Sequence, residues 1–202
     1  MPAHPRPVVR DPDAKRRRIL EAARRLLVAD GFQDVVLDDV AREADVAKGT
    51  LFLYFKNKEE LVFAAFSDLV ESLGLELAAL AKTGVAGREL LVAAARVILG
   101  HFDRHRDFMG QIGSRRLPGC GARSRERLLE KYRANHAHVV RILELAAKDG
   151  APPPDAEFAA AAFIGLCRSA AVRKIVRGDD GALEAEAEAV VSFFLNGSGL
   201  SL

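Results

Sequence analysis

Two short helices joined by a tight turn are predicted by residues 37–60, which read LDDVAREADVAKGTLFLYFKNKEE. The first helix carries apolar residues at the i, i+3, i+4, i+7 spacing of one buried face, namely Leu37, Val40, Ala41 and Ala44. Asp45 follows as a short polar residue that tolerates a left-handed backbone, which suits the turn. The pattern predicts a helix-turn-helix over residues 36–55.

The second helix, over residues 47–54, has an inward-facing pair at i and i+4, Leu51 and Phe55. Its outward face combines a cation, hydroxyl groups and bare apolar groups, contributed by Lys48, Gly49, Thr50, Phe52, Leu53 and Tyr54. In a DNA groove an ammonium binds phosphate, a hydroxyl reads a base edge, and an apolar side chain packs on a thymine methyl group. The face therefore predicts contact with duplex DNA.

The following helix begins with a capping-box pattern, in which Asn57 is followed by Glu60 three residues later. Lys58 lies in this first turn, and its ammonium group is predicted to bind a DNA phosphate. The full set of predicted DNA contacts is Leu37, Lys48, Gly49, Thr50, Phe52, Leu53, Tyr54 and Lys58. The alternative is that these helices are plain elements of a buried bundle, in a helical interaction protein that binds no DNA.

These residues resemble the helix-turn-helix domain of the tetracycline-repressor (TetR) family of bacterial transcription regulators. The matching motifs are Ile19-Leu20-Glu21-Ala22-Ala23, Gly31-Phe32, Asp39-Val40-Ala41, residues 44–55, and Asn57-Lys58-Glu59-Glu60-Leu61. The resemblance covers about residues 13–73 and implies a three-helix DNA-binding domain there, preceded by a basic, Pro-rich arm at residues 1–12. It also implies an effector-binding and dimerisation domain over residues 74–202. DNA contacts are implied for Lys48, Gly49, Thr50, Phe52, Tyr54 and Lys58.

Four departures from the family pattern predict weaker DNA binding than in a typical member. Val35 and Val36 stand where the family usually has Thr, so a side-chain cap and a phosphate hydrogen bond are missing. Asp45 replaces a turn Gly, Ala47 replaces a capping Ser, and Phe52 replaces a Tyr. Each change removes a polar contact or adds negative charge.

Charge is concentrated toward the predicted DNA-binding end of the 202-residue chain, whose overall net charge is +2. Residues 1–58 hold 12 Lys and Arg against 9 Asp and Glu, a local excess of +3. Arg6, Arg10 and the basic run at residues 15–18 contribute much of it. They act either as a DNA-contacting arm or as an ordinary solvated helix start.

No segment predicts export or a membrane span. The first 12 residues lack an apolar core, and no apolar stretch reaches the roughly 20 residues that a span requires. We therefore expect a cytoplasmic protein without membrane contact. Cys120 and Cys167 lie far apart in the sequence and are expected to remain thiols in that reducing compartment.

An all-α fold is predicted, because the segments between Gly and Pro breakers are rich in helix formers and show no strand alternation. The expected helices are 14–29, 37–44, 47–54, 57–81, 88–111, 123–148, 155–177 and 182–196, with one more if 88–111 bends.

The last two helices suggest how subunits assemble. The helix at residues 155–177 is rich in small residues and apolar on nearly every face. Neighbouring helices must therefore pack against several of its faces. Residues 182–196 pair apolar side chains with an acidic edge. The resemblance implies that both helices from each of two subunits form a four-helix dimer interface. The alternative is that they belong to the core of one monomer.

A mixed group of aromatic, sulfur-containing and polar residues predicts an effector pocket for a small hydrophobic molecule. Its members are His101, Phe102, His105, Phe108, Met109, Ile112, Arg115, Tyr132, His136 and Cys167. The same side chains serve equally well as ordinary core. Because His101 and His105 are i, i+4 neighbours close to Asp103, a metal-responsive regulator is a further alternative.

Taken together, the residues predict a homodimeric repressor that binds a palindromic DNA operator and is released by a small hydrophobic effector. Catalysis is not expected, because the sequence has no glycine-rich phosphate loop, nucleophile elbow or supported Cys-His arrangement. No cofactor and no resident metal are expected either.

Overall fold

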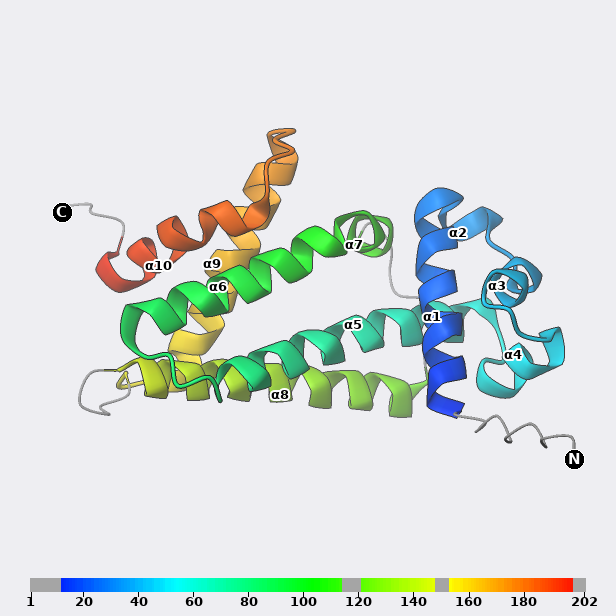
Figure 1. Ribbon diagram of the computed structural model, residues 1–202, viewed down its shortest axis with the longest axis horizontal. Helices are drawn as coiled ribbons and strands as arrows, with labels where there is room; N and C mark the ends of the chain where they lie inside the picture. Colours follow the sequence, from blue (N-terminus) through cyan, green and yellow to red (C-terminus); the bar gives the residue numbers. More distant parts are fainter. Residues whose placement is uncertain (1–11, 114–120, 148–152, 198–202) are drawn as a thin grey trace, which may run out of the picture. The chain divides into compact units, whose positions relative to one another are not determined.

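The computed structural model describes residues 12–113, 121–147 and 153–197, and every regular element in these ranges is helical (Figure 1). The predicted all-α fold is confirmed. In chain order the elements are α1 (Pro12–Ala29), α2 (Gly31–Asp34), α3 (Leu37–Glu43), α4 (Lys48–Tyr54), α5 (Lys58–Leu80), α6 (Gly87–Arg104), α7 (Arg106–Gly113), α8 (Ala122–Ala146), α9 (Ala156–Val176), the 3-10 helix η2 (Leu183–Glu186) and α10 (Ala187–Asn196).

Three elements differ from the sequence-based expectation. The single turn α2 was not predicted, because four residues are too few to show a helical period. The segment expected at 88–111 bends at His105, whose φ of −119° ends α6 before α7 begins. The segment expected at 182–196 starts as the 3-10 turn η2 and continues as α10.

The described residues fall into two compact units, the first comprising 12–66 and 111–113 and the second comprising 67–110, 121–147 and 153–197. The division between Phe66 and Ser67 and the boundary expected after residue 73 lie in the same helix, so α5 belongs to both units. In the first unit, apolar side chains of α1, α3, α4 and the start of α5 are buried. The most buried of them include Ile19, Leu20, Leu27, Val40, Leu51 and Leu61.

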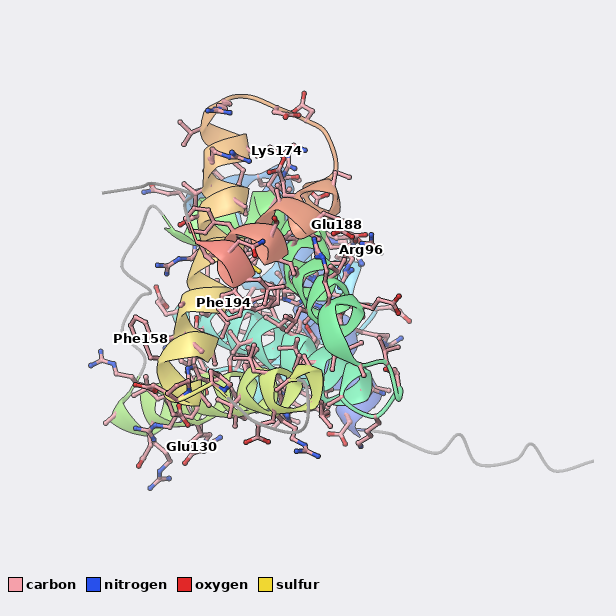
Figure 2. The ribbon with its side chains drawn as sticks, turned by 90° about the vertical axis from the view of Figure 1, so that its left-hand side faces the viewer. Arg96, Glu130, Phe158, Lys174, Glu188 and Phe194 are labelled. Atoms are coloured by element: carbon pink, nitrogen blue, oxygen red, sulfur yellow. The ribbon has the colours of Figure 1, made fainter. Side chains whose placement is uncertain are left out.

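The second unit is built around α6, which contacts α8, α9, η2 and α10. Phe163 of α9 is fully buried there and meets the ring of Phe194 edge to face, with ring centroids 5.1 Å apart. Figure 2 shows Phe194 pointing from α10 toward α9. At the far end of α6, Asp103 accepts a hydrogen bond from the backbone N–H of Leu183 at 3.2 Å, which fixes the start of η2.

Polar contacts join α5 to α8 within the second unit, where the two helices lie side by side (Figure 1). Asn135 is buried and donates from Nδ2 to the carbonyl oxygen of Val70 at 2.8 Å. One turn earlier, the Lys131 ammonium donates to Ser67 Oγ at 2.9 Å and lies 2.8 Å from a Glu71 carboxylate oxygen. The helices approach closely because Gly74 has no side chain, and a Cβ there would overlap the Asn135 side-chain oxygen.

Candidate nucleic-acid interface

The turn between α3 and α4 has the left-handed geometry that the sequence predicted. Asp45 has a φ of 51°, and it is the one non-glycine residue with positive φ in the described part of the chain. After the turn, the N–H of Val46 bonds to the carbonyl oxygen of Ala41 at 3.0 Å. Arg18 of α1 lies 3.7 Å from the Asp45 carboxylate, so the turn is also held from outside.

The buried and exposed side chains of α4 lie on opposite faces of the helix, as predicted. Leu51 and the following Phe55 are buried, with 0% and 3% of their surfaces exposed. On the opposite face Leu53 is 86% exposed and Phe52 is 42% exposed. Lys48 and Gly49 are exposed, while Thr50, Tyr54 and Leu37 are half-buried. The outward side chains are therefore available to a partner, and their contact with DNA stays a prediction.

Lys48, at the first turn of α4, is paired with an acidic side chain that the sequence had not singled out. Its Nζ lies 2.8 Å from Asp38 Oδ2 on α3, and both side chains are more than half exposed. An exposed pair of this kind contributes about 0–1 kcal/mol, so a phosphate can replace the carboxylate at small cost. Asp38 therefore orients the ammonium group.

Neither helix of the pair has a side-chain cap. Val36 is the N-cap residue of α3 and Ala47 that of α4, and neither side chain accepts a hydrogen bond from the first turn of its helix. The capping box of α5 is present, with the N–H of Glu60 bonded to Asn57 Oδ1 at 2.8 Å. Its return bond is displaced by one residue, because the Glu60 carboxylate accepts from the N–H of Lys56 at 2.9 Å.

Ala47→Ser is expected to stabilise the first unit by about 1 kcal/mol, because the hydroxyl can accept a hydrogen bond from the uncapped first turn of α4. Urea unfolding of the wild-type and variant proteins measures this difference. Ala47→Val is the control, since valine adds bulk without an acceptor. Equal stability of the Ser and Val variants would contradict the expected cap.

Lys58 points back to the backbone of its own unit. Its Nζ donates to the carbonyl oxygens of Gln33 and Val35, both at 3.1 Å. The phosphate contact predicted for Lys58 remains untested. The basic arm at residues 1–12 was predicted as a second DNA contact, and Arg6 and Arg10 lie outside the described residues.

A family model described as bacterial regulatory proteins of the tetR family matches residues 19–65, which span α1 to the first part of α5. Residues 19–65 therefore belong to the TetR family of bacterial regulatory proteins. An uncharacterized HTH-type transcriptional regulator of Bacillus subtilis, YhgD, is 39% identical over 59 residues, which are 29% of this chain and 31% of that protein. The fatty acid metabolism regulator protein of the same species is 35% identical over 51 residues, 25% of this chain and 26% of that one. The matched segments thus span about a quarter to a third of these curated relatives.

Solved structures of bacterial regulators share the fold along most of the chain. The fatty acid degradation regulator FadR of Bacillus halodurans has a TM-score of 0.73 at 18% identity, covering 93% of this chain and 97% of that one. FadR of Bacillus subtilis in complex with stearoyl-CoA has a TM-score of 0.72 at 19% identity, covering 90% and 98%. The expected absence of catalysis agrees with membership of a family of regulatory proteins, which are not enzymes.

His101, the first of the predicted pocket residues, lies in a charged cluster between α5 and α6. It is buried, and its Nδ1 is 3.4 Å from a carboxylate oxygen of Glu76, which also accepts two hydrogen bonds from Arg104 at 2.8 and 2.6 Å. Burial lowers the pKa of His101, and the Glu76 carboxylate opposes this shift. The centroids of the His101 and His105 rings are 4.7 Å apart.

The metal alternative suggested by His101 and His105 gains no support from the structure. Within the described ranges no three His, Cys, Asp or Glu side chains are placed to hold a metal.

The other predicted pocket residues are spread over several environments. Phe108 and Cys167 are buried, and Cys167 belongs to the continuous apolar core of the second unit. Burial raises the pKa of the Cys167 thiol to about 12, so the reactive thiolate is scarce at neutral pH. Tyr132 is 47% exposed, and burial of the rest of its ring raises its pKa. His136 is half-buried, with Nδ1 2.9 Å from a Glu157 carboxylate oxygen.

For the remaining members of the predicted pocket, the structure gives only how deeply some of the side chains are buried. Phe102, His105 and Met109 are half-buried. The side chains of Ile112 and Arg115, and the whole of Cys120, lie outside the described residues. The pocket therefore stays a prediction.

An open depression of about 300 Å³ lies elsewhere on the second unit, lined by Arg88, Glu89, Val92, Arg96 and Glu188. Glu188 of α10 lies 3.0 Å from Arg88 and 4.0 Å from Arg96, both on α6. Figure 2 shows Arg96 and Glu188 next to each other. No sequence signal links residues so far apart. The two arginines and two glutamates balance in charge, so the depression does not favour an anion or a cation.

Proposed function

We propose that the chain is a cytoplasmic, homodimeric transcription regulator that binds a palindromic DNA operator through α4 and is released by a small hydrophobic effector. The observation that carries the proposal is the outward face of α4, where Lys48 and the 86% exposed Leu53 stand on a TetR-family helix-turn-helix. A cation can bind phosphate and an exposed apolar group can pack on a thymine methyl, which are two of the contacts that proteins make at a major groove. None of the described helices is both long and apolar enough to cross a membrane.

The experiment that tests this function is selection of duplexes bound by the full chain from a random pool. A palindromic winner is expected, because two α4 helices related by a two-fold axis read two half-sites about 34–36 Å apart. Failure to enrich any sequence would contradict the proposal. Enrichment of a single, non-repeated half-site would contradict the dimer and leave the DNA-binding face intact.

Homodimerisation through α9 and α10 is supported by the apolar side chains that these helices leave exposed. They are Phe158, Val172, Ile175, Val176, Phe193 and Leu195, each at least 48% exposed. Figure 2 shows Phe158 projecting away from the helices. A monomer would leave this surface in water, whereas a second copy of the same chain would cover it.

Val172→Glu is expected to shift the protein from dimer to monomer, weakening association on the order of 100-fold or more, because an unpaired carboxylate would be buried in the interface. Light scattering after size exclusion at micromolar concentration measures this change. Leu75→Glu is the matched control, since Leu75 on α5 is 67% exposed and lies outside α9 and α10. A monomeric wild-type protein, or a dimeric Val172→Glu variant, would contradict the proposed interface.

The proposed hydrophobic effector is supported by the ligands of two proteins with the same fold. FadR of Bacillus subtilis was solved with stearoyl-CoA, and SmeT was solved with triclosan, at TM-scores of 0.72 and 0.65. A screen of long-chain acyl-CoA thioesters and chlorinated phenols for release of the selected duplex tests this class. If DNA binding and effector binding are coupled, the duplex must weaken effector binding by the same factor.

A further inference from the structure

We propose that Lys58 is a positioning residue for the DNA-reading helices, whose ammonium group fixes the corner between α2 and α3 and does not bind a DNA phosphate. The role in reading DNA rests on the proposed function. The contact itself is a property of the protein without DNA. It replaces the phosphate contact that the sequence pattern predicts for this residue.

The contact geometry places the ammonium between two backbone acceptors. Lys58 Nζ is 3.1 Å from the Gln33 carbonyl oxygen and 3.1 Å from the Val35 carbonyl oxygen. Carbonyl oxygens at the end of a helix lack their usual intrahelical N–H donors, and a lysine ammonium can donate to them instead. The Val35 side chain is buried, with 3% of its surface exposed.

The position of Lys58 in its own helix explains why the side chain turns this way. It is the first residue of α5, where the free N–H groups carry partial positive charge and favour the carboxylates of Glu59 and Glu60. A cation is unfavourable at that end. Directing the ammonium toward the carbonyl end of α2 removes the conflict and leaves the side chain half-buried.

This chain depends on such a contact because the start of α3 has no cap. Val36 occupies the cap position, and its side chain makes no hydrogen bond to the first turn. The corner that Lys58 holds leads directly into α3, and α3 carries Asp38, whose carboxylate orients Lys48 on α4. The orientation of the reading helix is thus tied to Lys58 through the backbone of residues 33–37.

The test compares Lys58→Met with wild type in two measurements on the full chain. Hydrogen–deuterium exchange without DNA follows the amides of Asp39 and Val40, which bond to the Val36 carbonyl oxygen at 3.2 and 3.3 Å. We expect these amides to exchange on the order of tenfold faster, the size expected for loss of a charged hydrogen-bond donor, while amides of α6 are unchanged. Lys58→Gln keeps one neutral donor and should give a smaller increase, and it provides the measurement if the Met variant does not fold.

The second measurement is the salt dependence of binding to the duplex that wild type selects from a random pool. Each phosphate contact that is lost lowers the slope of log affinity against log salt by about 0.9. We expect Lys48→Met to lower the slope and Lys58→Met to leave it unchanged. Lys56→Met is the charge control for exchange, because Lys56 is exposed two residues away.

Unchanged exchange in Lys58→Met, or a salt slope that falls as far as that of Lys48→Met, overturns the positioning role. Failure of wild type to select any duplex overturns the proposed function instead, and the exchange measurement still decides whether Lys58 holds the corner.

Discussion

Gly74→Ala is expected to lower the free energy of unfolding by about 2 kcal/mol, although the same change in an open helix would raise stability by up to about 1 kcal/mol. The reversal follows from the close approach of α5 and α8, where a Cβ at Gly74 would overlap the side-chain oxygen of Asn135. Asn135 is short and buried, and it is fixed by its 2.8 Å bond to the Val70 carbonyl oxygen. It cannot move aside without losing that bond.

Urea unfolding of four variants, namely Gly74→Ala, Asn135→Ala, the double variant and Gly49→Ala, separates the overlap from other effects of the methyl group. All variants are measured without DNA. Gly49→Ala is the control, because a Cβ at Gly49 meets no atom within 4 Å. Combining Gly74→Ala with Asn135→Ala removes the overlapping oxygen, so the double variant should be more stable than the sum of the single changes predicts. Strict additivity, or a stabilised Gly74→Ala protein, would show that the helices can separate freely.

The local pattern of the sequence was sufficient to predict α3, α4 and the turn between them. Leu51 and Phe55 mark a buried face by spacing alone, and Asp45 is one of the few residues that accepts a positive φ. The same reasoning worked for the capping box at Asn57, because all of its atoms lie within one turn.

Contacts between distant segments could not be predicted in this way. Asn135 meets Gly74 and Asp103 meets Leu183 across dozens of residues, and a single sequence carries no signal for such pairs. The predicted pocket drew on residue type alone, and Tyr132 turned out to be 47% exposed. Periodicity gives the face of a helix but does not name the neighbour that covers it.

Lys48→Ala is expected to weaken binding to the selected duplex on the order of 100-fold at physiological salt. Each of the two subunits loses a charged hydrogen bond to phosphate, and each leaves the Asp38 carboxylate without the Lys48 partner that lies 2.8 Å from it. Asp38→Asn is expected to do the opposite, because it removes a negative charge near the DNA and frees the ammonium group. Its gain should be similar for selected and scrambled duplexes, since phosphate contacts carry no sequence information.

Titrations at several salt concentrations measure both effects, with Lys82→Ala as the control for loss of one positive charge from an exposed site in the second unit. A salt slope reduced by about 0.9 for each lost contact would assign Lys48 to phosphate. Leu53→Ala completes the comparison, because the 86% exposed leucine should affect the choice of base and leave the slope unchanged. If Lys48→Ala binds as tightly as Lys82→Ala, α4 does not enter the groove with this face, and the exposed residues of α4 need another partner.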